Sequence, residues 1–177
     1  MLKVILKWTA LIAPSLFMNV FGKAICWILP FFVQADGWLP SWLSWFSTPD
    51  NNADGDAGHW ERHPGTDWWS TYKRRTAWFW RNTCYGFDMQ ILGVQVLETD
   101  TITVEGNPDI GDQSGISGKC YRELIRDEEM LAFQWYFVKH YELFGKWHKC
   151  VRIGVGWKLW NAKPFLAQYW LYFNPMK

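Results

Sequence analysis

The first 35 residues constrain the fold most, because they contain almost no strongly polar side chains. Between Trp8 and Val33 only Asn19 and Lys23 are strongly polar. About 20 residues of helix are enough to cross the hydrocarbon of a bilayer. The run is longer than the apolar region of a usual signal peptide, and no clean small-residue cleavage site follows it. The sequence therefore predicts a membrane helix over residues 1–35, either spanning or obliquely embedded, with a buried core helix as the alternative.

Two prolines and a line of polar side chains modify this helix. Pro14 is expected to kink it, and Pro30 to kink it again or to end it. The polar side chains fall four residues apart or at multiples of four, and such positions drift by about 40° per step around a helix. We therefore expect no straight polar stripe along the helix. The positions are Lys3, Lys7, Ser15, Asn19 and Lys23.

Tryptophan is the compositional outlier, with 15 residues in a chain of 177, where average usage would give roughly two. Its large ring with one N–H donor favours membrane interfaces and binding surfaces, and an aromatic-rich core is the alternative. Residues 37–47 predict a short helix that lies at the headgroup level or covers a core. Residues 66–87, capped by Thr66 or Asp67, predict a basic aromatic helix at the interface or an ordinary packed helix. The predicted interface residues are Trp38, Trp42, Trp45, Trp68, Trp69, Trp78 and Trp80.

A loop dense in acidic side chains lies between these two helices. Residues 50–61 read DNNADGDAGHWE and match a calcium-binding loop, in which alternating oxygen ligands surround a tight turn at Gly55. Pro49 precedes the loop and Pro64 follows it closely, so the paired helices of an EF-hand are not expected. We predict a solvated loop whose Asp and Asn side chains bind their own backbone, with Ca2+ binding as the second interpretation. The candidate ligands are Asp50, Asn52, Asp54, Asp56 and Glu61.

Catalytic chemistry finds little support in the sequence. His59 and His63 are four residues apart, but the order His-x-Glu-x-His does not place Glu61 where a metalloprotease base lies. No nucleophile elbow, P-loop or dinucleotide fingerprint occurs. The chain is therefore predicted to act without catalysis and without a cofactor. The alternative is a metal-dependent hydrolase that uses the loop 50–63, with Asp50, Asp54, Asp56, His59 and His63 as its polar groups.

Charge and cysteine usage argue against further classes of function. The net charge of +1 lacks the basic excess of a general nucleic-acid binder. The four cysteines form no Cys-x-x-Cys pair, so their spacing supports neither a zinc site nor a small disulfide scaffold.

The second half of the chain changes to extended patterning. Four runs alternate or are rich in β-branched and aromatic side chains, and short turns separate the last three. They predict an antiparallel meander of four to six strands, interrupted by a long glycine-rich loop at residues 106–118. The runs are residues 90–108, 130–143, 148–160 and 165–173, with turns at Phe-Gly-Lys (144–146) and Asn-Ala-Lys-Pro (161–164).

The predicted fold class is therefore α+β, in three segments. Residues 1–35 form an apolar membrane helix. Residues 36–87 form Trp-rich interfacial helices with the acidic loop, and residues 88–177 form a small antiparallel β domain.

Several blocks of the chain resemble a known group of proteins. The block DGWLPSWLSWFSTPDNNADGDAGHW, followed by WFWRNTCYGF, GWKLW and a terminal NP, resembles small uncharacterised proteins of tailed bacteriophages that are usually predicted to be membrane-associated. The resemblance covers most of the chain. It implies a phage setting, and it carries over no activity and no catalytic residue.

These observations lead to one main functional hypothesis. It is a non-enzymatic, membrane-associated phage protein that binds a host or phage partner at the bacterial inner membrane, in host takeover, exclusion of other phages or lysis. Its expected partners are membrane lipid and a protein that the sequence does not identify. A virion component with aromatic assembly surfaces is a further alternative, beside the hydrolase.

Overall fold

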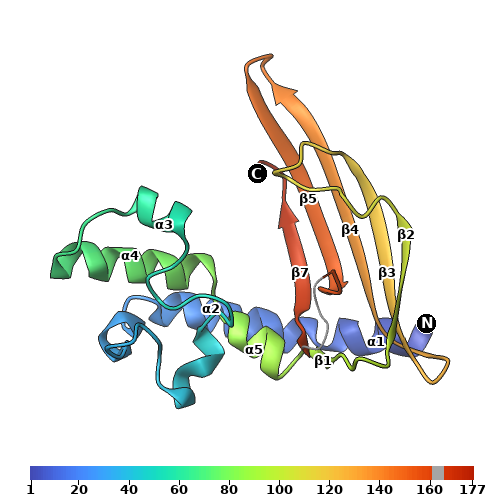
Figure 1. Ribbon diagram of the computed structural model, residues 1–177, viewed down its shortest axis with the longest axis horizontal. Helices are drawn as coiled ribbons and strands as arrows, with labels where there is room; N and C mark the ends of the chain where they lie inside the picture. The colour runs from blue at the N-terminus through green and yellow to red at the C-terminus, as the bar shows by residue number, and fades with distance from the viewer. Residues whose placement is uncertain (161–165) are drawn as a thin grey trace. The chain divides into compact units, whose positions relative to one another are not determined.

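The computed structural model describes residues 1–160 and 166–177 (Figure 1). The chain forms two compact units: a sheet unit of Met1–Ala10 and Gly93–Lys177, and a helical unit of Leu11–Leu92. The predicted α+β class is confirmed, because helices and antiparallel strands occupy separate parts of the chain. The predicted turn at residues 161–164 and the first residue of the predicted strand 165–173 lie outside the described residues.

The sheet unit is built on a five-stranded antiparallel sheet in the order β2-β3-β4-β5-β7. The predicted meander is confirmed, since β2, β3 and β4 each pair with the next strand and β5 pairs with β7 (Figure 1). Strands β1 and β6 form a separate two-stranded pair. The strands are β1 (Val94–Gln95), β2 (Thr101–Gly106), β3 (Gly118–Arg126), β4 (Glu129–Leu143), β5 (Trp147–Trp157), β6 (Leu166–Ala167) and β7 (Tyr169–Asn174).

Two of the predicted strands agree closely with β4 and β5, and residues 144–146 form the turn between them. Strand β3 matches none of the predicted runs. Its inward side carries Cys120, Arg122 and Leu124, and a buried arginine breaks the apolar alternation that would mark a half-buried strand. The predicted run at 90–108 is also divided, because Gln90 ends a helix and the strands begin only at Val94.

Helix α1 (Leu2–Ala10) belongs to the sheet unit, although it opens the apolar run. The Trp8 ring stacks on Tyr169 at 6.0 Å between centroids and meets Phe133 edge-on at 6.1 Å. The Tyr169 hydroxyl donates a hydrogen bond to the Trp8 carbonyl at 3.4 Å. Stacked and edge-to-face pairs of this kind stabilise a core beyond the area they bury, so Trp8 anchors α1 on the sheet.

The helical unit packs short helices around a small aromatic core. Its buried side chains include Leu43, Phe46, Trp78, Phe79 and Phe87. The elements are α2 (Ile12–Ile25), the 3-10 helices η1 (Leu29–Phe32) and η2 (Ser41–Phe46), α3 (Ala57–Arg62), α4 (Trp68–Arg81) and α5 (Tyr85–Gln90).

Proline and capping residues set the helix ends. A kink is predicted at Pro14, and the structure has a break at Leu11 between α1 and α2, where Pro14 has no N–H to donate to the Ala10 carbonyl. The predicted cap Asp67 is also confirmed, since its Oδ1 accepts from the N–H groups of Trp69 and Ser70, each at 3.0 Å.

The predicted helices at residues 37–47 and 66–87 differ in extent from the observed ones. The first is a 3-10 helix that begins after Pro40. The second ends at Arg81, because Cys84 adopts a left-handed conformation (φ 51°) before the separate helix α5 begins.

The predicted segments 1–35, 36–87 and 88–177 differ from the two observed units. Residues 1–10 lie with the sheet, and residues 11–35 lie with the helices that follow them. The apolar run is divided because Trp8 packs on strand residues, whereas Ser15 and Gly22 pack on residues near α5. The sequence pattern shows that the run is apolar but not which partners each part contacts.

Candidate functional site

Helix α2 directs its apolar side chains outward. Leu16, Phe17, Val20 and Phe21 have exposed fractions between 44% and 69%. Their spacing of three and four residues places them on one side of the helix, and Phe17 stacks on Phe21 at 6.5 Å between ring centroids. One side of α2 is therefore a continuous exposed apolar surface.

The opposite side of α2 is small and polar, and it is the side that packs on the helical unit. The Ser15 hydroxyl is buried and donates to Asp88 Oδ1 at 2.9 Å. Gly22 is buried so closely that a Cβ there would lie 2.6 Å from both Cys84 Sγ and Thr83 Cγ2. Asn19 lies on the same side and donates to the Ser15 carbonyl. Lys23, the last polar residue of α2, is exposed and lies outside this inward side, so the polar residues of the helix do not form one straight inward stripe.

The helical stretch Leu2–Ile25 is long and apolar enough to cross a membrane by length and composition, and 11% of its most apolar window is buried. The alternative of a core helix requires a mostly buried helix. Most of this window is therefore exposed.

Six of the seven predicted interface tryptophans are exposed: Trp38, Trp42, Trp45, Trp68, Trp69 and Trp80. The seventh, Trp78, is a correction. It is 4% exposed and packs edge-on against His59 at 5.0 Å between ring centroids. On α4 the inward side carries Trp78 with Phe79 and Arg74, so Trp78 belongs to the core and cannot contact an external surface.

The exposed aromatic rings of α4 and η1 form a cluster. Phe31 lies 5.4 Å from Tyr72 between ring centroids, and Trp68 and Trp69 both stack on Tyr72 at 5.7 and 5.4 Å. The Tyr72 hydroxyl donates to the carbonyl of Trp27, whose own ring is exposed. Rings held in this way present a rigid apolar surface with N–H groups at its edge.

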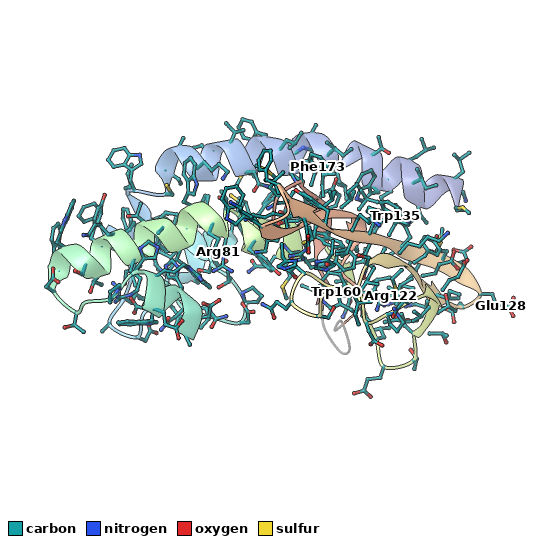
Figure 2. All side chains as sticks on the ribbon, turned by 90° about the horizontal axis from the view of Figure 1, so that it is seen from above. Arg81, Arg122, Glu128, Trp135, Trp160 and Phe173 are labelled. Carbon is teal, nitrogen blue, oxygen red and sulfur yellow. The ribbon has the colours of Figure 1, made fainter. Side chains whose placement is uncertain are left out.

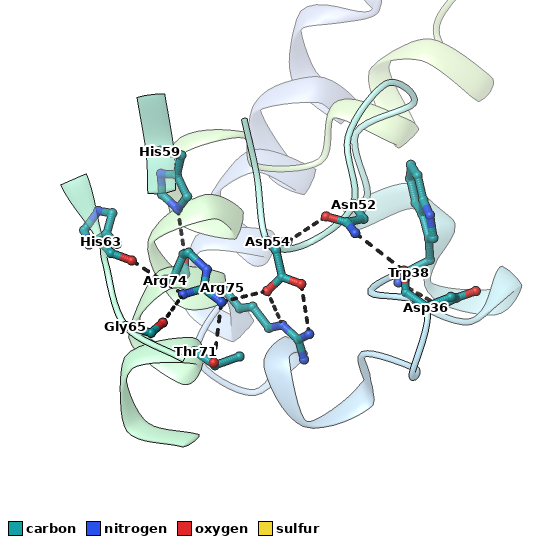
Figure 3. A network of polar contacts seen from close by, with 10 residues as sticks. All are labelled: Asp36, Trp38, Asn52, Asp54, His59, His63, Gly65, Thr71, Arg74 and Arg75. Atoms are coloured by element: carbon teal, nitrogen blue, oxygen red, sulfur yellow. Dashed lines mark hydrogen bonds and ion pairs between the residues drawn. The ribbon is translucent and has the colours of Figure 1, made fainter. Parts of the chain in front are cut away.

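The acidic loop is held by arginines of α4, as Figure 3 shows. Asp54 accepts two hydrogen bonds from Arg75, at 2.9 Å from Nε and 3.1 Å from Nη2, and a third from Arg74 Nη2 at 3.3 Å. Burial alone would raise the pKa of Asp54, but the hydrogen bonds and charges of Arg75 and Arg74 outweigh it and hold the pKa below its usual value. Both carboxylate oxygens of Asp54 therefore bind guanidinium groups.

The remaining candidate ligands also have structural roles or point to solvent. Asn52 Oδ1 accepts from the Asp54 N–H at 3.1 Å, which is the predicted binding of the loop to its own backbone. Asp56 caps α3 by accepting from the His59 N–H at 2.7 Å. Asp50 and Glu61 are exposed. Within residues 1–160 and 166–177, no three His, Cys, Asp or Glu side chains are grouped to hold a metal ion.

The two histidines of the hydrolase alternative are placed for packing. His59 is 2% exposed, and its Nε2 lies 2.9 Å from the Arg74 carbonyl (Figure 3). Burial lowers the pKa of His59 and keeps its ring neutral. His63 ends α3 and its ring lies 4.7 Å from that of His59. His59 is therefore buried inside the helical unit, and the described side chains of the loop 50–63 are not grouped as a metal site.

The sequence pattern does not identify Arg74 and Arg75 as partners of the acidic loop. Arg74 donates to the Gly65 carbonyl at 2.7 Å, and its guanidinium lies 3.5 Å from the Trp60 ring centroid. The lysine-arginine run of α4 predicts only a basic helix. Because about 20 residues separate these arginines from Asp54 in sequence, no local pattern links them.

The fold and surface define a small α+β protein with an antiparallel sheet unit and a helical unit that exposes an apolar helix face. The chain belongs to a family of unknown function, DUF7338, whose model matches residues 1–177. The searches of curated proteins and of solved structures found no match.

Proposed function

We propose that the protein binds a membrane surface through the outward side of α2, which lies in the plane of the interface. The observation that carries this proposal is the inverted arrangement of α2: its apolar side chains face outward, and Ser15 and Gly22 face the protein. In a surface helix of a soluble protein the apolar side faces the core. An apolar side that faces outward is stabilised when hydrocarbon replaces water around it.

The free energy of transferring these apolar side chains out of water is large enough to support membrane binding. Complete transfer of a Leu, Phe or Val side chain from water contributes roughly 1.5–3 kcal/mol. Four outward side chains of α2, exposed by 44–69%, then contribute about 3–7 kcal/mol together. The exposed tryptophans of η2 and α4 add amphipathic rings of the kind that collect at the headgroup level.

An in-plane helix fits the contacts of α2 better than a spanning one. Ser15, near its start, binds Asp88, and the Lys23 ammonium, near its end, lies 4.3 Å from the Trp80 ring centroid. A spanning α2 would carry Asp88 and the charged side of α4 into hydrocarbon, where each charge costs about 2.5–3.5 kcal/mol or more. An in-plane helix leaves these groups at the wet side of the interface.

The protein then acts as a membrane-associated binding protein, and its partner is a second part of the proposal. The phage setting rests on the resemblance of the Asp-Gly-Trp-Leu-Pro block and its companions. In that setting the partner is a host or phage protein at the bacterial inner membrane.

Two matched variants test the membrane proposal. Phe17→Lys and Phe173→Lys replace the same residue type at the same exposed fraction, 69%, but only Phe17 lies on α2. We expect the wild type and Phe173→Lys to sediment with membranes and with phospholipid vesicles. Phe17→Lys should lose at least about tenfold in vesicle affinity while it keeps its circular dichroism spectrum.

Two outcomes contradict the proposal: a full-length chain that is soluble and monodisperse without detergent, or equal vesicle binding by both variants. Recovery of the protein in purified particles, and not in the membrane pellet, supports the virion alternative instead.

A further inference from the structure

A cavity of about 300 Å3 lies in the sheet unit, against one side of the sheet. The loop that follows β2 supplies residues 108–114 of its wall, and Arg122, Tyr136, Arg152 and Trp160 supply the rest. Figure 2 shows Arg122 and Trp160 on the same side of the sheet, with Trp135 on the other. The membrane proposal uses no residue of this cavity.

Arg122 is a buried cation that lacks an acidic partner. Its exposed fraction is 7%, and among the described residues no carboxylate lies within 4 Å of its guanidinium. Residues 161–165, Asn-Ala-Lys-Pro-Phe, contain no acidic side chain that could supply one. A buried charge without a counter-charge is costly, and an anionic ligand beside Arg122 would lower that cost.

The neighbours of Arg122 on the sheet are neutral. The thiol of Cys120 is 0% exposed and hydrogen-bonds with Arg122. Burial raises the pKa of this thiol by more than the charge and hydrogen bond of Arg122 lower it, so the thiol remains protonated. Across the β3–β4 pair lies Gln134, whose Oε1 accepts from the Leu159 N–H at 2.7 Å. Neither group neutralises the guanidinium.

Arg152 provides a second guanidinium at the cavity wall. Its Nη1 binds Asp112 Oδ2 at 3.0 Å, but Asp112 is shared with the Lys177 ammonium at 3.7 Å. The Nε of Arg152 is buried and, in the described part of the chain, has no acceptor. In register, Arg152 pairs with Val138 and Arg122 with Gln134, so the two arginines lie on either side of Tyr136.

We propose that this cavity binds a phosphate-type oxyanion, held by Arg122 and by the free donor of Arg152 beside Tyr136. Guanidinium groups match the oxygens of a phosphate with paired N–H donors. Trp160 lies at the wall, is 40% exposed and is 5.5 Å from Tyr136 between ring centroids. Its ring supplies an aromatic surface for the rest of a phosphate-bearing molecule. Asp109 also lines the cavity, but it is exposed to water and its charge is screened there.

The test is the melting temperature of the full-length chain in a mild non-ionic detergent, with sodium phosphate or with sodium chloride at equal ionic strength. We expect phosphate to raise the melting temperature progressively, because a ligand that binds only the folded state stabilises it. Isothermal titration of the wild type with inorganic phosphate measures the same binding without any variant.

Two arginines of β3 provide matched variants. Arg122→Gln should melt at or above the wild type, because it removes a buried unpaired charge, and should bind phosphate at least about tenfold more weakly. Arg126→Gln is the control: Arg126 binds the buried Asp100 at 2.7 Å, so this variant should melt lower and keep the full phosphate response.

Equal effects of phosphate and chloride on the wild type overturn the proposal, as does an undiminished phosphate response of Arg122→Gln. An Arg122→Gln chain that fails to fold also overturns it, since Arg122 would then have a structural partner. Vesicles identify the source of the phosphate group. Competition by phosphatidylglycerol but not phosphatidylcholine vesicles supports a lipid headgroup, and phosphate binding unaffected by either supports a soluble phosphate compound.

Discussion

At the scale of single residues, the Asp54 carboxylate fits a calcium-binding sequence pattern but forms ion pairs within the protein. Asp54 lies at a ligand position of a calcium-like pattern, yet its oxygens bind Arg75 and Arg74. A Ca2+ ion would have to displace two guanidinium groups that are themselves largely buried. The same network joins α3 to α4 through His59 and Arg74 (Figure 3), so Asp54 stabilises the helical unit.

This arrangement predicts the effect of Asp54→Ala on stability. Removal of the carboxylate leaves Arg74 and Arg75 without their counter-charge and should lower the free energy of unfolding by about 2 kcal/mol. We expect the same loss, measured by thermal melting, in EDTA and in millimolar calcium. Asp50→Ala, at an exposed position of the same loop, should change stability by less than about 0.5 kcal/mol. A calcium-dependent rise in the melting temperature of the wild type that is absent in Asp54→Ala would show that the loop is a metal site.

At the scale of elements, helix α2 depends on a close approach to the residues between α4 and α5. Gly22 allows this approach because any Cβ would meet Cys84 and Thr83 at 2.6 Å. The Cys84 thiol donates to the Met18 carbonyl at 2.9 Å on the neighbouring turn of α2. Small residues at such crossings let two backbones pack closely, and this contact determines which side of α2 faces outward.

Substitution of Gly22 tests the crossing. Gly22→Leu should push α2 away from Cys84 and lower the free energy of unfolding by about 1–3 kcal/mol, as overpacking does in other cores. Ala24→Leu adds a comparable bulk on the exposed side of the same helix and should leave stability unchanged or improve membrane binding. Chemical denaturation of both variants measures the difference, and equal stabilities would show that α2 does not pack as described.

At the scale of the whole molecule, the in-plane proposal predicts where the two ends of the chain lie. If α2 does not cross the membrane, tags fused before Met1 and after Lys177 are on the same side. In sealed vesicles of one orientation, an added protease should cut both tags or neither. Vesicles opened with detergent, in which both tags must be cut, are the control. Cleavage of one tag alone would indicate a spanning helix, with the positive-inside rule placing Lys3 and Lys7 in the cytoplasm.

The sequence by itself determined the α+β class, the strands near residues 130–143 and 148–160, the helix cap at Asp67 and the interruption at Pro14. Each of these depends on local physics: alternation of side chains along a strand, a carboxylate that binds nearby N–H groups, or a proline without an N–H. The apolar character of the first 25 residues is likewise read directly from the sequence.

Only the tertiary structure decided what these residues contact. The division of the apolar run between Trp8 on the sheet and Ser15 on Asp88, the burial of Trp78, and the pairing of Asp54 with Arg75 all join positions that are distant in sequence. A sequence periodicity of 3.6 residues in a helix, or of two in a strand, indicates which side chains share a face. It does not indicate which distant element covers that face. The cavity at Arg122 is the clearest case. Arg122 lies in strand β3, which the alternation of side chains did not reveal. It becomes a buried cation only because the loop 108–114 and strand β4 pack beside it.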